Sequence, residues 1–279
     1  MRIRAGDITP KRVYDALQRR LEDIPDKRAW THSPLGVQNR AGLEKFRDIH
    51  KRERCFLMAN GPSLGRMDLS PIKDEITIGL NRIYLIFDQL GFQPTYYAAS
   101  NELIIEQFHE DIRKLEMPKF IGWHRREYLL DDKDVLPENT CFLRDKLSLE
   151  DTFSKDVTKG ITSGGTVTYH MLQLAYFMGI QEVVLIGLDH NFKEQGTPNK
   201  MEVRTGTDEN HFHPDYWPKG SKWQLPDLYR TNIAYANARK AFEADGRKII
   251  DATPGGKCEI FEKTDFASVL NTSGSGKEL

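Results

Sequence analysis

Residues 160–192 read GITSGGTVTYHMLQLAYFMGIQEVVLIGLDHNF and decide the fold. The stretch begins with small and hydroxyl-bearing residues, continues through a helical pattern, and ends in the apolar strand 183–186 before Gly187, Leu188 and Asp189. Hydroxyls and unpaired N–H groups at a helix start attract phosphate, because the positive end of the helix dipole adds to them. Asp189 follows the carboxyl end of a strand, where open α/β sheets bind their ligands. The stretch therefore predicts half of a nucleotide site.

A second turn of this kind lies upstream, in the segment RCFLMANGPS (54–63). The apolar strand 55–59 breaks at once into NGPS, a tight turn in which the glycine lets the backbone approach a ligand closely. The turn is neither GxGxxG nor a Walker A sequence, because the spaced glycines and the Gly-Lys-Ser/Thr ending are missing. Alone, NGPS is equally well explained as a structural turn. Its pairing with ITSG (161–164) favours a ligand site.

Length and composition indicate one large soluble α/β domain with appendages. The chain has 279 residues, of which 39% are hydrophobic and 29% charged. Forty basic against 41 acidic residues give a net charge of −1, so we expect no nucleic-acid partner. We expect neither a signal peptide nor a membrane span. Three scattered cysteines suit reduced thiols rather than disulfides or a zinc cluster. We therefore expect the protein to be cytoplasmic.

The pattern along the chain divides it into three parts. Residues 1–50 are charged and helix-prone, which predicts a helical arm that packs on the domain or on another subunit. Strands and helices alternate over 51–270, as is typical of βαβ units with helices on both faces of a mostly parallel sheet. We predict a Rossmann-like three-layer α/β sandwich for this part and a disordered tail or linker remnant over 271–279. The expected strands are 55–59, 76–80, 95–99, 119–122, 140–143, 182–186 and 248–251, and the expected helices are 83–90, 103–115, 164–178 and 227–244.

The segment 190–226 interrupts this alternation. It is polar, rich in glycine, proline and aromatic residues, and too long for a plain connection, which is typical of a lid. Its part HFHPDYWPKGSKW (211–223) carries histidine, lysine and indole groups. We expect a mobile lid with little apolar burial. Its closure over the NGPS and ITSG turns would bring His211 or His213 into the site together with Tyr216.

The motifs occur in a distinctive order: NGPSL, a strand that ends in asparagine, ITSG before a helix, a strand into Gly-Leu-Asp, and a histidine-bearing lid. In this order they resemble the bacterial sialyltransferases with a single-Rossmann glycosyltransferase fold. Between Asn60 and Asp251 the chain resembles even more closely a broad family named after the archaeal 6-hydroxymethylpterin diphosphokinase, which in turn resembles the flagellin-glycosylating motility accessory factors. The resemblance implies the fold, and it implies either glycosyl or diphosphoryl transfer.

The resemblance to the sialyltransferases also implies site residues. The positions that would hold a cytidine monophosphate (CMP) sugar are Asn60, Gly61, Ser63, Asn81, Thr162, Ser163 and Gly164, and the segment SNELIIEQF (100–108) adds Ser100 and Asn101. The family's proposed lid base falls on His211 or His213. Gly160 stands where those enzymes have an arginine, and Asn191 where they have a tyrosine that assists the leaving phosphate, so Tyr216 or a lid lysine would substitute.

Asp189 and His190 are candidates from position alone. Asp189 is placed to bind a ribose hydroxyl or magnesium, although carboxylates at strand ends also cap loops. His190 is a second candidate for a catalytic imidazole, because it follows Asp189 directly.

Three functions stay open. The first is an inverting glycosyltransferase that requires no cofactor and no metal, with a CMP-linked acidic sugar as donor, a surface glycan or glycoprotein as acceptor, and His211 or His213 as base. The second is an ATP-dependent diphosphokinase for a pterin-like alcohol, with Mg²⁺ on Asp189 and Asp215. The third is a non-catalytic nucleotide-binding subunit of a glycan-assembly complex. Peripheral membrane association and a homo-oligomer also stay open.

Overall fold

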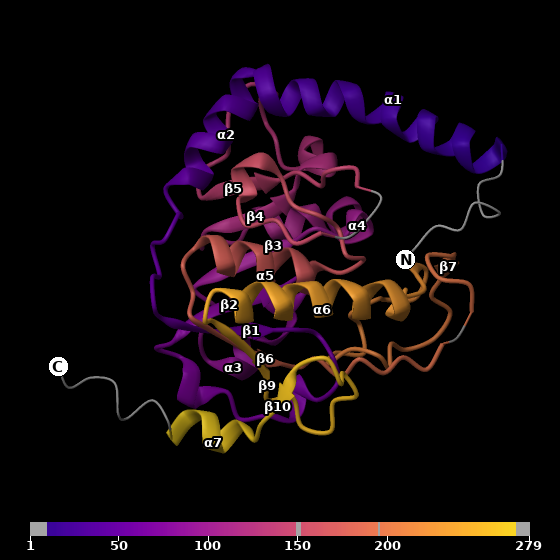
Figure 1. Cartoon of the computed structure of the whole chain (residues 1–279). Helices are drawn as coiled ribbons and strands as arrows, with labels where there is room; N and C mark the ends of the chain where they lie inside the picture. The colour runs from indigo at the N-terminus through magenta and orange to yellow at the C-terminus, as the bar shows by residue number, and fades with distance from the viewer. Residues whose placement is uncertain (1–9, 149–151, 195, 272–279) are drawn as a thin grey trace.

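A parallel sheet of eight strands forms the centre of the molecule in a computed structural model that describes residues 10–148, 152–194 and 196–271 (Figure 1). The strand order is β10-β9-β6-β1-β2-β3-β4-β5, and every neighbouring pair runs parallel. The strands are β1 (Arg54–Met58), β2 (Ile76–Leu80), β3 (Tyr96–Ala99), β4 (Lys119–Gly122), β5 (Thr140–Leu143), β6 (Glu182–Ile186), β9 (Lys248–Asp251) and β10 (Glu262–Lys263). The predicted Rossmann-like α/β fold is confirmed.

Helices cover both faces of this sheet. The α-helices are α1 (Pro10–His32), α2 (Pro34–Glu44), α3 (Phe87–Leu90), α4 (Glu102–Arg113), α5 (Val167–Phe177), α6 (Leu228–Ala244) and α7 (Phe266–Asn271). Short 3₁₀ turns are η2 (Leu64–Arg66), η3 (Ser70–Ile72), η4 (Ile83–Ile86), η5 (Trp123–Tyr128) and η6 (Val157–Lys159). Helices α5 and α6 lie side by side over one face (Figure 1). Right-handed crossovers put α3 and α4 on the other face.

The central strands form because their apolar runs are buried on both faces. Cys55, Phe56, Leu57 and Met58 of β1 are all fully buried, as expected for the inner strand of a parallel sheet. Such apolar runs can be recognised in the sequence, and the expected strands begin and end within one residue of the observed ones.

The helix expected from residue 164 begins later, at α5. Gly164 and Gly165 have φ of 57° and 74°. These values lie in the left-handed region, so neither glycine can belong to a right-handed α-helix. Thr166 is the N-cap, and its hydroxyl accepts a hydrogen bond from the Thr168 amide at 3.3 Å. The ITSG motif therefore precedes the helix start by a two-glycine turn, and the expected boundary is wrong.

The part predicted as a helical arm consists of α1 and α2. Helix α2 packs on the body, because Leu43 is fully buried and the Asn39 side chain exchanges hydrogen bonds of 2.9 and 2.6 Å with the backbone of Phe142. Helix α1 runs along the edge of the molecule (Figure 1). Among the described residues, no helix is both long and apolar enough to cross a membrane.

The lid segment is more ordered than its composition suggests. It contains a two-stranded antiparallel sheet of β7 (Met201–Val203) and β8 (Lys222–Gln224). Tyr216, Trp217 and Trp223 are buried, so the expectation of little apolar burial is wrong. Its mobility stays a prediction. The tail predicted over 271–279 lies outside the described residues, apart from Asn271 at the end of α7.

Candidate functional site

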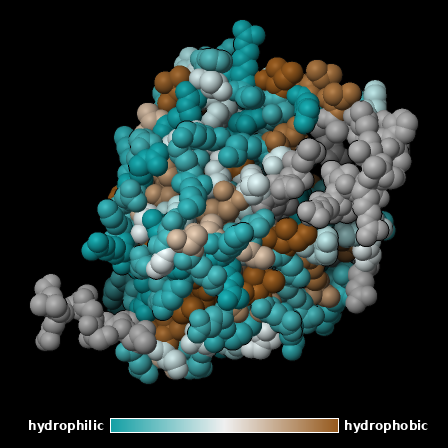
Figure 2. All heavy atoms as spheres, viewed as in Figure 1, coloured by the Kyte–Doolittle hydropathy of each residue, from teal (hydrophilic) through white to brown (hydrophobic). Residues whose placement is uncertain are grey.

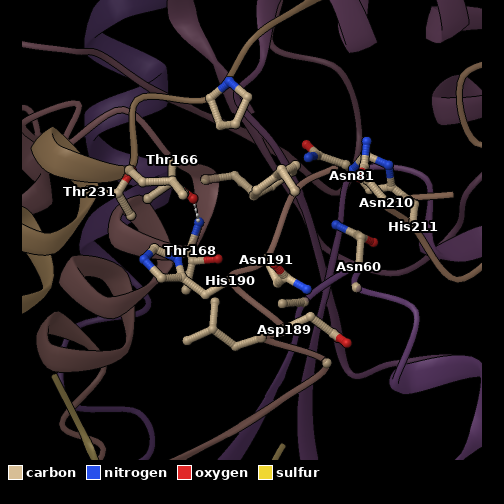
Figure 3. A pocket seen from close by; sticks show the side chains of 18 of the residues that line it. Asn60, Asn81, Thr166, Thr168, Asp189, His190, Asn191, Asn210, His211 and Thr231 are labelled. Carbon is tan, nitrogen blue, oxygen red and sulfur yellow. Dashed lines mark hydrogen bonds between the residues drawn. The ribbon is translucent and has the colours of Figure 1, made fainter. Parts of the chain in front are cut away.

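The first cavity lies where the order of the strands reverses. Strands β2 to β5 extend the sheet on one side of β1, whereas β6 pairs with its other side. Open α/β sheets bind ligands at this point, outside the carboxyl ends of the strands. The cavity is lined by the turns after β1, β2 and β6, by the starts of α5 and α6, and by the lid. Its polar lining residues are Asn60, Asn81, Thr166, Thr168, Asp189, His190, Asn191, Asn210, His211 and Thr231 (Figure 3).

The NGPS turn is held against the end of β6. The Gly61 amide donates to the Gly187 carbonyl at 2.8 Å, and the Ser63 hydroxyl donates to the Asp189 carboxylate at 2.5 Å. A Cβ on Gly61 would collide with that carboxylate, so only glycine fits. Asp189 lines the cavity, whereas the buried Ser63 does not. The contact of Ser63 with Asp189 therefore fixes the turn.

Two amide oxygens of this edge lack a protein partner. The Oδ1 atoms of Asn60 and Asn81 are buried, and neither has a hydrogen-bond partner among the described residues. Both side chains line the first cavity, and Figure 3 shows them on one side of it together with Asn210 and His211. Buried acceptors without a partner are unfavourable and rare in proteins. A ligand with a hydroxyl or amino donor would satisfy them.

His211 reaches the same side of the cavity from the lid. Its Nδ1 lies 2.7 Å from Oδ2 of Asp208, whose side chain is fully buried. Burial alone would favour the neutral acid, but the hydrogen bond and charge of His211, the Asn210 amide and Arg204 together lower the pKa of Asp208. An ionised Asp208 holds the proton of His211 on Nδ1, which leaves Nε2 as an acceptor. The pair has the arrangement of an oriented general base.

The Tyr216 ring packs against the ring of His211. The two rings stack with centroids 3.9 Å apart and an angle of 2° between their planes. Burial raises the pKa of the Tyr216 phenol, against hydrogen bonds from the Asn81 side chain and the Arg82 backbone. Tyr216 therefore stays protonated, and its hydroxyl is engaged with the turn after β2. The geometry makes it a positioning residue for His211.

The lid is anchored to both strand-end turns. The Phe212 amide donates to the Asn60 carbonyl at 3.0 Å. The buried Arg82 guanidinium donates to the carbonyls of Asp215 and Tyr216, each at 2.6 Å. Because both anchors are hydrogen bonds to backbone groups, they fix the position of the lid over the cavity whatever side chains it carries.

The other side of the cavity carries hydroxyls and a second imidazole. Thr166, Thr168 and Thr231 lie there with His190 (Figure 3). Burial lowers the pKa of His190, although Asn232 binds its Nε2 at 2.8 Å and opposes the shift. His190 is therefore neutral near pH 7. The start of α5 lies at this side of the cavity, and the positive end of its helix dipole suits an anionic group.

A second, larger cavity adjoins the first across Gly165, Thr166 and Val167. Ser100, Asn101 and Ser163 line it, so the predicted nucleotide residues are divided between two neighbouring cavities. The cavity has a volume of about 430 Å³, against about 160 Å³ for the first. It is also more charged, with Glu102, Glu106, Arg125, Asp145, His170, Lys222 and Arg230 in its lining.

Four predicted residues line neither of these two cavities: Ser63, Thr162, Gly164 and His213. The buried Thr162 hydroxyl donates to the Thr152 carbonyl, and Gly164 packs against Tyr169 and Ala234. The ring of His213 accepts a hydrogen bond from the Asp215 amide at 3.1 Å. A direct ligand role for these residues stays a prediction, which their surroundings do not favour.

Three residues of the site, Asp208, Thr166 and Thr168, are not among the predicted ones. The signal for Asp208 was present, because an aspartate three residues before a histidine is placed to bind its ring within one turn of chain. The hydroxyls of TVT (166–168) were missed because the helix start was expected at the preceding ITSG motif.

No protein-family model matches the chain, and no curated protein matches its sequence. It is similar in structure to the MAf glycosyltransferase from Magnetospirillum magneticum AMB-1, with a TM-score of 0.50 and 16% identity over 84% of this chain. It spans only 40% of that protein. It also aligns with the sialyltransferase CstII from Campylobacter jejuni, with a TM-score of 0.43 and 13% identity, over 76% of this chain and 85% of that one. The likeness to the MAf protein extends to the fold.

Proposed function

We propose that this protein is an inverting glycosyltransferase that uses a nucleotide-activated sugar, with His211 as the general base. The main support is that the His211–Asp208 pair opens onto a switch-point cavity in which two buried amide oxygens, of Asn60 and Asn81, have no hydrogen-bond partner within the described part of the chain. A sugar has the hydroxyl donors that these oxygens need. The base beside them is suited to removing a proton from an acceptor hydroxyl.

The chemistry follows from this arrangement. Nε2 of His211 takes the proton of the acceptor hydroxyl while its oxygen attacks the anomeric carbon. The bond from that carbon to the phosphate oxygen breaks on the opposite face, and the phosphate leaves with the electron pair. The positive end of the α5 helix dipole and the hydroxyls of Thr166 and Thr168 stabilise the developing charge. The protein donors neutralise the leaving group in this scheme, so it requires no cofactor or metal.

The two adjoining cavities suggest how the donor binds. The sugar would occupy the first cavity, beside Asn60 and Asn81, and the nucleoside the larger second cavity, beside Ser100, Asn101 and Ser163. The phosphate would then cross the wall at Gly165–Val167, next to the start of α5. The resemblance of the NGPS and ITSG motifs to those of sialyltransferases supports cytidine as the base and an acidic sugar. The acceptor would be a surface glycan or glycoprotein.

The diphosphokinase alternative needs two carboxylates that share a metal ion. The Asp189 carboxylate accepts a hydrogen bond from Ser63. Asp215 is exposed and lies outside the lining of the first cavity. No observation therefore favours this chemistry over glycosyl transfer.

Nucleotide-dependent thermal shifts and donor turnover test the proposal together. CMP should raise the melting temperature without magnesium more than ATP or UDP does, and the protein should release CMP from a CMP-linked nonulosonic acid. His211→Asn should keep the thermal shift and lose the turnover. Stabilisation by ATP and magnesium but not by CMP, with AMP release in the presence of 6-hydroxymethyldihydropterin, would establish the diphosphokinase instead. Binding of CMP without turnover of any CMP-sugar would indicate the non-catalytic subunit.

A further inference from the structure

Helix α1 has an apolar face that no part of the described chain covers. Tyr14, Leu17, Leu21 and Ile24 recur every three or four residues, so they lie on one side of the helix. Their exposed fractions are 63%, 54%, 66% and 56%. Figure 2 shows hydrophobic surface along the edge of the molecule formed by α1. Single exposed apolar residues are ordinary, whereas a contiguous stripe marks an interaction surface.

The opposite face of α1 is fixed to the body. The buried Trp30 ring meets Trp123 edge to face with centroids 5.1 Å apart. Asp26 binds His124 and Arg126, each at 2.9 Å, and Asp23 binds the buried Arg144. The apolar stripe therefore cannot turn inward without loss of these contacts.

Basic side chains accompany the apolar stripe. Arg20, Lys27 and Arg28 are exposed, and none of them forms an ion pair among the residues that the structure describes. Asp23 and Asp26 of the same helix bind the body instead. Two acidic residues are thus engaged on the inward face, while the described outward side chains comprise the apolar stripe, three exposed basic residues and the exposed Glu22, and keep a net positive charge.

We propose that α1 lies on a membrane surface that contains anionic lipids. A helix with an apolar face and flanking basic residues inserts its apolar side chains at the headgroup boundary and attracts anionic headgroups. The contact would hold the sheet edge and its two cavities beside the membrane. This inference is independent of the proposed transferase activity, because it depends on the outer face of α1 alone.

A second copy of the chain fits this face less well. The apolar stripe covers about two heptads, which is short of the three to four heptads typical of a coiled coil. Arg20 and Lys27 are seven residues apart and so lie on the same edge of the stripe. In an antiparallel symmetric pair this edge would meet its own copy, and the like charges would repel.

Co-sedimentation of the full chain with lipid vesicles tests the proposal. We expect binding to vesicles of equal parts phosphatidylglycerol and phosphatidylcholine, and at least tenfold weaker binding to phosphatidylcholine alone. Each basic residue near an anionic surface contributes about fivefold, so Arg20→Gln with Lys27→Gln and Arg28→Gln should weaken binding by about a hundredfold. Leu17→Gln with Leu21→Gln and Ile24→Gln should abolish it.

Matched controls on other surfaces separate these effects from general loss of charge or apolar area. Val135→Gln with Ile49→Gln removes two exposed apolar residues elsewhere, and Lys133→Gln with Lys240→Gln removes two exposed charges; both should bind as the unchanged protein does. Melting temperatures should be equal in all variants. Absence of binding to anionic vesicles, or unchanged binding by the variant at residues 17, 21 and 24, would overturn the proposal. A dimer in sedimentation velocity that this variant dissociates would also overturn it, because a second copy would then cover the stripe.

Discussion

The edge of the sheet and the lid build the same cavity by different means. At the edge, backbone geometry shapes the cavity: Gly61 fits against Asp189, and Asn81 has a φ of 48° after β2. In the lid, a network of charged side chains runs from Glu194 through Arg204 to Asp208 and His211. The difference suggests a division of labour in which the edge binds the ligand and the lid supplies the reactive group. Changes in the two regions should then have separable effects.

The largest effect is expected from the lid imidazole. His211→Asn should lower kcat by about a hundredfold or more, because a general base contributes that much, while the Kd for CMP stays nearly unchanged. His213→Asn is the matched control, since His213 lies two residues away and outside the lining of the cavity. Steady-state kinetics and calorimetry measure both. A larger loss in the His213 variant would break the assignment.

The carboxylate behind His211 should matter both for rate and for stability. Asp208→Asn removes the charge that orients the ring, and we expect kcat to fall by about tenfold or more. It also leaves the buried Arg204 with one carboxylate fewer, which should cost about 3 kcal/mol of unfolding free energy. Denaturant unfolding and kinetics on the same variant give the two numbers.

The pH dependence of this stability term has a defined sign. The folded pKa of Asp208 is lowered, so its contribution is present above the unfolded value of about 3.9 and is lost as the pH falls through the folded value. The stability difference between Asp208→Asn and the unchanged protein should therefore be constant from pH 5 to pH 6 and should shrink in stronger acid. A difference that grew with acid would contradict the ionised state of Asp208.

The sheet edge should affect binding without a loss of stability. Asn60→Ala removes a buried oxygen that has no partner among the residues described by the structure, so the unfolding free energy should change by less than about 1 kcal/mol. The KM for the donor should rise by about tenfold, the equivalent of one hydrogen bond to a ligand. Ser63→Ala is the control at the same turn, because it loses the bond to Asp189 and should destabilise the fold. Loss of stability in Asn60→Ala with unchanged KM would make Asn60 a structural residue.

The same division explains what the sequence could predict. Apolar runs such as 55–58 identify buried strands by composition alone, and glycine or asparagine at their ends identifies the turns. Strands β7 and β8 were not predicted, because three residues of mixed polarity carry no periodic signal. The burial of Trp223 beneath Arg204, with the guanidinium 4.2 Å from the ring centroid, depends on contacts between distant residues. A network of this kind is invisible to local patterns, which is why the lid was expected to be poorly packed.

The smallest expected effect comes from a histidine–aspartate pair outside the lid, between His124 and Asp26. Their side chains are 28% and 29% exposed, whereas Asp208 is fully buried, so solvent screening should hold their contribution to about 1 kcal/mol or less. The hydrogen bond to Asp26 raises the pKa of His124, and that to His124 lowers the pKa of Asp26 to about 2.

The pH window of this contribution follows from the two shifts. The contribution of His124 to the unfolding free energy is present below its unfolded pKa of about 6.5 and is lost as the pH rises through the higher folded pKa. The contribution of Asp26 to the unfolding free energy is present above its unfolded pKa of about 3.9 and is lost only as the pH falls toward the folded pKa of about 2. The unfolding free energy of the unchanged protein should therefore exceed that of His124→Gln most between about pH 4 and 6.5. Urea titrations at pH 5.5 and pH 8.5 measure this difference. A difference equal at both pH values would mean that the pair holds α1 through packing rather than charge, unlike the pair in the lid.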